Sequence, residues 1–218
     1  MTAVQLDAVT LQIPLSAILL LPLATGPITT ELTRGTARTT WLTLADRPTA
    51  FCGKLLISAA LGGAGALVGA ALTALAMTTT LALTGRPHPV WGQTLPSLLG
   101  YTLFMICWPV IATSVAALVR NRAATAMLLV LWPLLGERIT ALLLRVARLD
   151  VLAGWLPFGA GRAAMAEGAD TLPQTDRPLV DTLVGSDLSA GPGAALFLAF
   201  TVVAAVVGAR SYRAENAS

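Results

Sequence analysis

Long apolar runs alternate with short polar segments along this chain. A membrane-spanning helix needs about 20 consecutive, mainly apolar residues, because the hydrocarbon core of a bilayer is roughly 30 Å thick. Five stretches meet this requirement, and they cover residues 9–28, 55–83, 95–119, 123–144 and 193–209. We therefore predict an all-α polytopic membrane bundle of about five transmembrane helices, in a single domain over residues 1–218.

Two of these stretches carry features that affect helix geometry. Residues 55–83 are longer than a bilayer requires, so this helix is expected to tilt or to project from the membrane. Gly65 and Gly69 form a GxxxG pair within it, which lets another helix approach closely, and we interpret the pair as helix-packing residues. In the fourth stretch, Pro133 and Gly136-Glu137-Arg138 predict an interruption of the helix.

Two of the polar segments between the spans predict further helical structure. In the first, residues 29–54, the run from 31 to 40 predicts two to three helical turns that end near Asp46-Arg47-Pro48. The second, residues 145–192, is acidic. Residues 141–152 and 160–167 look partly helical, with a hinge at residues 155–159. We expect these pieces to re-enter the membrane or to lie on its outer surface.

Composition agrees with a membrane location and suggests an orientation. Hydrophobic residues make up 56% and charged residues only 11%, against about 25% in soluble domains. The net charge of +3 is too small and too scattered to favour nucleic acid. The segments 29–54, 120–122 and 210–218 hold eight of the 14 basic residues, so the positive-inside rule predicts that they and the C-terminus are cytoplasmic. Arginine-rich, lysine-poor usage hints at a GC-rich bacterial genome, and for such a membrane protein we predict the bacterial inner membrane as its location.

Few residues offer catalytic or ligand-binding chemistry. There is no GxxxxGK[ST] loop, no HExxH motif, one histidine (His88), and two cysteines (Cys52 and Cys107) that do not make a disulfide framework. We therefore expect no metal and no cofactor bound by this chain. Lys54 and Ser58 are spaced as a Ser–Lys pair would be, but a lysine that extends its amine to the membrane surface has the same spacing.

Glu137 is the sharpest signal inside a predicted span. It lies about 14 residues, or ~21 Å, from the cytoplasmic end of its helix, beyond the bilayer midplane. An acid there costs on the order of 2.5–3.5 kcal/mol on insertion scales, so it should face protein or water. Two interpretations stay open. Either Glu137 lines a pathway or contacts a second subunit, or it pairs with Arg138 or caps a broken helix.

The order of these features resembles a known family. A span is followed by Glu31, by Gly35-Thr36, by residues 42–48, and by Lys54 at the start of a long Gly/Ala-rich span. This order resembles the permease subunit of exporter-type ABC transporters, the ABC-2-type membrane proteins. The run from Trp132 to Glu137 resembles that family's fifth span, and Trp155-Leu156-Pro157-Phe158 resembles its outer re-entrant helices. The resemblance runs from the family's second span to its sixth; a counterpart of the first span is lacking.

The resemblance implies a function that the residues alone do not. It implies that the chain forms the substrate path of an ATP-driven exporter, together with a second permease subunit, in a homodimer or a heterodimer. It implies a cytoplasmic coupling helix that contacts a separate ATP-binding subunit, at Glu31, Arg34, Gly35, Thr36 and Arg38. ATP and Mg²⁺ would be bound by that partner, so this chain is not expected to be an enzyme. Glu137 would lie in the pathway or at the dimer seam.

Two other classes of function remain as alternatives. An intramembrane lipid-modifying enzyme would need convergent polar groups at one depth, and the sequence offers Glu137 with scattered serines and threonines. A non-transporting membrane anchor or immunity subunit would recruit a partner without moving a substrate. Drugs, antibiotics, lipids and polysaccharides all remain open as exported substrates.

Overall fold

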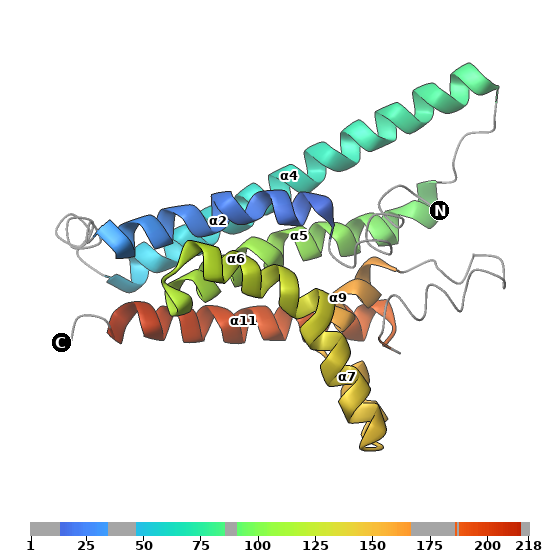
Figure 1. Ribbon diagram of the computed structural model, residues 1–218. Helices are drawn as coiled ribbons and strands as arrows, with labels where there is room; N and C mark the ends of the chain where they lie inside the picture. Colours follow the sequence, from blue (N-terminus) through green and yellow to red (C-terminus); the bar gives the residue numbers. More distant parts are fainter. Residues whose placement is uncertain (1–13, 35–46, 86–90, 167–185, 187, 215–218) are drawn as a thin grey trace.

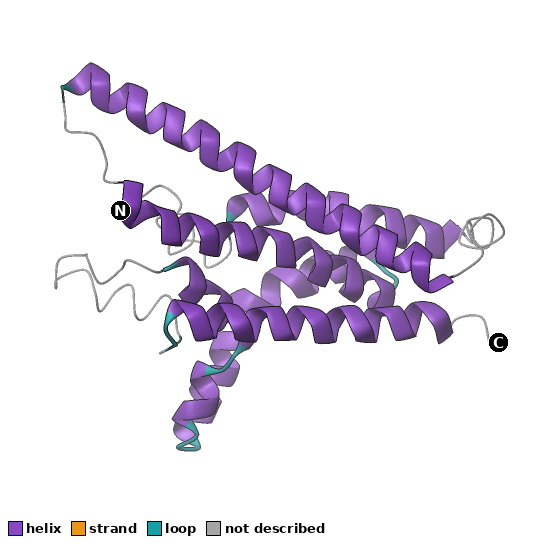
Figure 2. Ribbon diagram, turned by 180° about the vertical axis from the view of Figure 1, so that it is seen from behind, coloured by secondary structure: helices purple, strands orange, loops and turns teal. Residues whose placement is uncertain are grey.

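Helices account for all the regular structure in the part of the chain that the computed structural model describes, residues 14–34, 47–85, 91–166, 186 and 188–214 (Figures 1 and 2). The all-α prediction is therefore confirmed for these residues, which contain no strand. In chain order the elements are α2 (Leu15–Arg34), α4 (Arg47–Thr84), α5 (Trp91–Val119), α6 (Arg122–Leu131), the π-helical turn η1 (Trp132–Gly136), α7 (Glu137–Val146), α8 (Asp150–Gly154), α9 (Pro157–Met165) and α11 (Ala190–Ala214).

Four of the described helical segments are long and apolar enough to cross a membrane: Thr49–Thr84, Leu95–Val119, Arg122–Val146 and Ala190–Tyr212. They coincide with the second to fifth stretches expected from the sequence. The counterpart of the first stretch is α2, which is not among the four, and residues 9–13 lie outside the described residues. A protein with several membrane-spanning helices is thus supported, while a count of five stays a prediction.

The second candidate span, in α5, forms the centre of the bundle. In its most apolar window 61% of the residues are buried, against 17% in each of the other three candidates. It contacts α2, α4, α6, α9 and α11. The buried rings of Phe104 and Trp108 lie 5.6 Å apart on it, and Phe104 stacks on Phe197 of α11 at 5.0 Å. The indole N–H of Trp108 donates to the carbonyl of Ala17 at 3.0 Å, which joins α5 to α2.

Glycine brings α4 and α5 together, but not at the predicted pair. A Cβ added to Gly62 would lie 1.9 Å from the carbonyl oxygen of Met105, so only glycine allows this approach. At Gly65 and Gly69 no other described part of the chain lies within 4 Å of such a Cβ. Within this chain the close contact is therefore one turn earlier than expected. A packing role for Gly65 and Gly69 against another chain stays a prediction.

The long helix α4 extends past its neighbours. Its 38 residues span about 57 Å at 1.5 Å per residue, well beyond the ~30 Å of a hydrocarbon core. Figure 1 shows its C-terminal half standing away from the other helices. Apolar side chains on this half are exposed, for example Leu72 at 61%. The helix therefore extends past the other described helices, while its tilt in a membrane or its projection from one stays a prediction.

The interruption expected in the fourth stretch is also present. The helix from α6 to α7 changes to π-helical geometry over Trp132–Gly136. Pro133 lacks the N–H that would continue the α-helical ladder, and the ring of Trp132 lies over Gly136, where a Cβ would be 2.7 Å from it. Beyond this turn α7 leaves the direction of α6 and points away from the bundle (Figure 1).

Candidate functional site

Basic segments that are far apart in the sequence meet at one end of the bundle. There the start of α4 contacts the end of α11 through the rings of Phe51 and Tyr212, whose centroids are 5.2 Å apart. Ser211 of α11 donates to the carbonyl of Ala117 near the end of α5 at 3.4 Å. The end of α2 joins the same cluster through Ile28. The described parts of the segments predicted to be cytoplasmic, residues 29–34, 47–54, 120–122 and 210–214, therefore flank a common end (Figure 1).

An ion pair links the two helices that border residues 35–46. Glu31, in the last turn of α2, accepts a hydrogen bond from the amine of Lys54, which lies two turns into α4. Both side chains are partly shielded, with 22% of the Glu31 and 17% of the Lys54 side chain exposed. The pair fixes the end of α2 against the beginning of α4.

Of the predicted coupling residues, the structure describes two. Glu31 and Arg34 belong to the end of α2; Gly35, Thr36 and Arg38 lie outside the described residues. Residues 31–34 are helical, as expected for the start of the run 31–40, but they continue α2 through Pro27 instead of beginning a separate helix. Proline removes only its own N–H, and neighbouring groups in a bundle tolerate that loss. Likewise α4 begins at Arg47, earlier than the start of the second span predicted at residue 55.

Lys54 and Ser58 bond to different partners in this structure. The Ser58 hydroxyl pairs with the Thr113 hydroxyl at 2.9 Å, and Thr113 donates to the carbonyl of Ala24 at 3.2 Å. Because Thr113 has a single hydroxyl proton, Ser58 is the donor in the first of these bonds. This small network joins α4, α5 and α2, and Lys54 is engaged by Glu31 instead.

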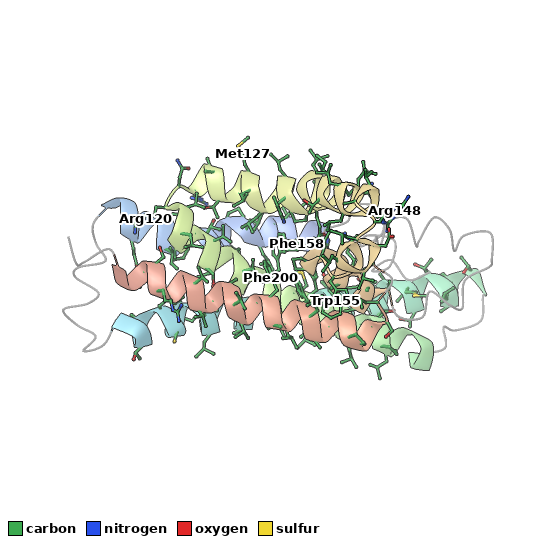
Figure 3. All side chains as sticks on the ribbon, turned by 90° about the horizontal axis from the view of Figure 1, so that it is seen from below. Arg120, Met127, Arg148, Trp155, Phe158 and Phe200 are labelled. Atoms are coloured by element: carbon green, nitrogen blue, oxygen red, sulfur yellow. The ribbon has the colours of Figure 1, made fainter. Side chains whose placement is uncertain are left out.

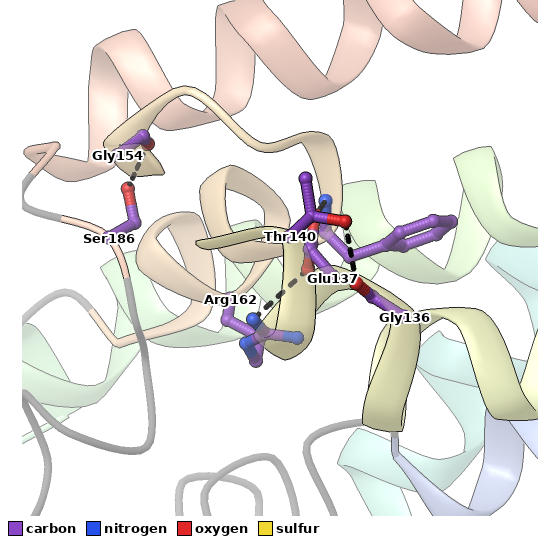
Figure 4. Close-up of polar contacts among 7 residues, drawn as sticks. Gly136, Glu137, Thr140, Gly154, Arg162 and Ser186 are labelled. Atoms are coloured by element: carbon purple, nitrogen blue, oxygen red, sulfur yellow. Dashed lines mark hydrogen bonds and ion pairs between the residues drawn. The ribbon is translucent and has the colours of Figure 1, made fainter. Parts of the chain in front are cut away.

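Glu137 is enclosed at the opposite half of the bundle. It is 2% exposed and begins α7, directly after the π-helical turn. One carboxylate oxygen accepts the backbone N–H of Phe158 at 2.7 Å, and the other accepts the guanidinium of Arg162 at 3.1 Å. Figure 4 shows this carboxylate directed at α9, with Thr140 bonded back to the carbonyl of Gly136 one turn away.

The bond to Phe158 caps a helix whose own sequence provides no cap. The residue before α9 is Leu156, which has no side-chain acceptor, and Pro157 follows at the first helical position. The free N–H groups at a helix start carry partial positive charge and attract an anion. Glu137 provides that anion from another helix, and Arg162, on the next turn of α9, balances its charge. The three groups connect α7 firmly to α9.

Of the two interpretations of Glu137, the contacts favour the second, in which the carboxylate pairs with an arginine and caps a helix. The arginine is not the one that was expected. Its cation is Arg162, not Arg138, whose side chain is exposed. Because its own chain encloses the carboxylate, direct contact with a second subunit or a substrate path would require the cluster to open. Sequence analysis missed Arg162. The sequence did contain a signal for it, because Arg162 is a single arginine within an alanine- and glycine-rich run. An arginine that is buried in such a run needs an ionic partner.

The helix α9 folds back into the bundle. It packs on α5 and α11, and residues 158–165 are all buried. Phe158 contacts Phe200 at 5.8 Å between ring centroids; Phe158 is buried and Phe200 is partly buried, while Figure 3 shows Met127 at the edge of the molecule. The hydroxyl of Ser186 donates a hydrogen bond to the carbonyl oxygen of Gly154 at 2.8 Å (Figure 4). This bond joins Ser186 to the end of α8.

The hinge expected at residues 155–159 is confirmed at its first two positions, since α8 ends at Gly154 and α9 starts at Pro157. The preceding piece is partly helical, as expected. Residues 141–146 belong to α7 and residues 150–152 to α8, and Arg148 between them adopts a positive φ of 59°. A turn therefore separates α7 from α8.

No group of three or more His, Cys, Asp or Glu side chains that could hold a metal ion occurs among the described residues. Comparisons of the chain with protein-family models, with curated proteins and with solved structures find no match. The function must therefore be argued from the geometry of the two ion-paired clusters and the arrangement of the helices.

Proposed function

We propose that this chain is the membrane-spanning subunit of an ATP-driven ABC exporter, located in a bacterial inner membrane. In this proposal its basic end faces the cytoplasm and seats a separate ATP-binding subunit. A second permease subunit, identical or different, completes the substrate path. ATP and Mg²⁺ belong to the partner subunit.

The observation that carries the proposal is the Glu31–Lys54 ion pair at the basic end. It holds together the two helices between which residues 35–46 lie, the segment expected to contact the ATPase. A displacement of that segment by the ATPase would therefore move α2 and α4 together. Both helices pack on the central α5, to which α2 is bonded through Trp108 and α4 is packed through Gly62.

The opposite half of the bundle supports the same proposal. There α8 and α9 follow the third candidate span, Arg122–Val146, and precede α11, in the order expected for re-entrant helices before a last span. Glu137 ties α9 to α7, and α9 packs on α5 and α11. Motion of the spans would therefore be transmitted to the outer end, where a substrate path would open.

Co-purification tests this proposal directly. The tagged chain is extracted in a mild detergent and the proteins that accompany it are identified by mass spectrometry. We expect a P-loop ATPase, and we expect its recovery to be lost when Arg34 and Arg38 are both changed to glutamate. Arg145 and Arg148, at the other half of the molecule, provide the matched control because both are exposed arginines outside the basic end.

Three outcomes are distinguishable. Loss of the ATPase in the Arg34/Arg38 variant alone supports coupling at this end. Equal loss in the Arg145/Arg148 variant would show that charge reversal acts nonspecifically, and would refute the assigned contact. Recovery of the chain without any ATPase would refute the exporter proposal and favour an anchor or an intramembrane enzyme.

A further inference from the structure

A cavity lies at the outer half of the bundle, apart from both ion-paired clusters. It has a volume of about 320 Å³ and is bounded by the start of α5, the end of α9 and the start of α11. Its lining consists of leucine, proline, alanine and glycine, so none of these side chains can form a hydrogen bond. From the geometry of this cavity, we propose that it binds one acyl chain of a bilayer phospholipid.

The cavity is built into the packing of the three helices. A Cβ at Gly100 of α5 would lie 2.0 Å from the carbonyl oxygen of Ala164 in α9, and a Cβ at Gly193 of α11 would lie 2.7 Å from that of Ala160. These two contacts hold α9 tightly against both neighbours. Next to them the residues that α9 and α11 contribute to the lining are alanine and glycine, whose small side chains leave space beside the leucines of α5.

Its position matches the upper part of a lipid tail. Leu95 and Ala190 are the first residues of their candidate spans, and both line the cavity. The lining continues along α5 to Leu103, a distance of about 12 Å by helix rise. The cavity thus begins where the apolar spans begin and extends toward the bilayer centre, as an acyl chain does.

Size and access point to the same occupant. An apolar cavity of ~150 Å³ takes up benzene and excludes water, so one of about twice that volume has room for a hydrocarbon segment. Leu99, on its rim, is 62% exposed, and the surrounding helix is apolar enough to face lipid. A tail in the cavity supplies the dispersion contacts that its walls otherwise lack.

Photo-crosslinking in lipid nanodiscs tests the inference. A phospholipid with a photoactivatable group midway along one acyl chain is included as a minor component, and labelled residues are identified by mass spectrometry. Leu72 of α4 is the internal reference, because it is 61% exposed and Leu99 is 62% exposed. We expect Leu99 and Leu103 to be labelled about tenfold more than Leu72, as a tenfold affinity difference would produce.

Two glycine variants provide a matched pair. Gly191 lines the cavity and is exposed, and a Cβ there has nothing within 4 Å, so Gly191→Leu adds a branched apolar side chain at the cavity without a clash. A Cβ at Gly65 has equally open surroundings, away from the cavity. We expect Gly191→Leu to reduce the labelling ratio to about one and Gly65→Leu to leave it unchanged. Ala194→Leu is the second filling variant if Gly191→Leu does not fold, as judged by circular dichroism and gel filtration.

Equal labelling of Leu99 and Leu72 in the wild-type chain overturns the inference, whatever else covers the cavity. The inference is also overturned if the ratio of Leu99 to Leu72 labelling is unchanged in a correctly folded Gly191→Leu or Ala194→Leu variant. Enrichment with a photoactivatable free fatty acid but not with the phospholipid overturns the assignment to a bilayer lipid. The experiment contains no ATPase, so its failure and the failure of the exporter proposal are independent.

Discussion

Removal of the Glu137 carboxylate should destabilise the connection between α7 and α9. Glu137→Ala eliminates the acceptor for the Phe158 N–H and the anion that faces Arg162. Both partners are buried, with Phe158 4% and Arg162 5% exposed, so water cannot replace the lost contacts without local opening. The substitution therefore tests whether this cluster holds α9 in the bundle.

The expected magnitude follows from the burial of the pair. Loss of one member of a buried ion pair typically costs about 3–5 kcal/mol, and we expect Glu137→Ala in that range. Glu137→Gln keeps a carbonyl oxygen for the Phe158 N–H, but its NH2 group is a donor that faces the Arg162 guanidinium, so the buried cation still loses its anion. We therefore expect this variant to lose about 3 kcal/mol, at the lower end of the same range, because the bond to Phe158 is kept. Combining Glu137→Gln with Arg162→Met should cost less than the sum of the two single changes, because neither charge is then buried alone.

Reversible unfolding in mixed detergent–SDS micelles, followed by circular dichroism, measures these differences. Arg145→Ala is the control, since Arg145 is an exposed residue on the same helix. A free energy of unfolding for Glu137→Ala within about 0.5 kcal/mol of that control would refute the structural role of the cluster. Additive single-variant effects would show that Glu137 and Arg162 act separately.

Further predictions concern the contacts of α4 with α2 and α5. Reversing one charge of the Glu31–Lys54 pair should cost about 1 kcal/mol, because the side chains are partly exposed, and exchanging the two charges should restore stability. Gly62→Ala should lower the free energy of unfolding by about 1–3 kcal/mol or more, because its Cβ meets the Met105 carbonyl at 1.9 Å. Gly65→Ala, with open space around it, should change it by less than about 0.5 kcal/mol. The same unfolding assay measures both, and equal effects of the two glycine substitutions would contradict the assigned α4–α5 contact.

Helix formation and the apolar character of the spans were predictable because both depend on neighbouring residues. The four candidate spans coincide with runs of apolar residues in the sequence, and the interruption at Trp132–Gly136 follows from Pro133. Helix ends were less predictable. The first polar segment was expected to begin at residue 29, but α2 continues to Arg34, because threonine and proline near its end are tolerated within a packed helix.

Which residues meet across the bundle was decided only by the tertiary structure. The sequence marked Glu137 as an acid that needs a partner, but Arg138 was its nearest cation in the chain. The actual partner, Arg162, lies 25 residues away on a helix that folds back into the bundle. In the same way the sequence showed several glycines in α4, and only the crossing of α4 with α5 selected Gly62 over Gly65 and Gly69. Local composition determines that a segment is helical and apolar, whereas pairing depends on which turns of distant helices face each other, and that is set by packing of the whole chain.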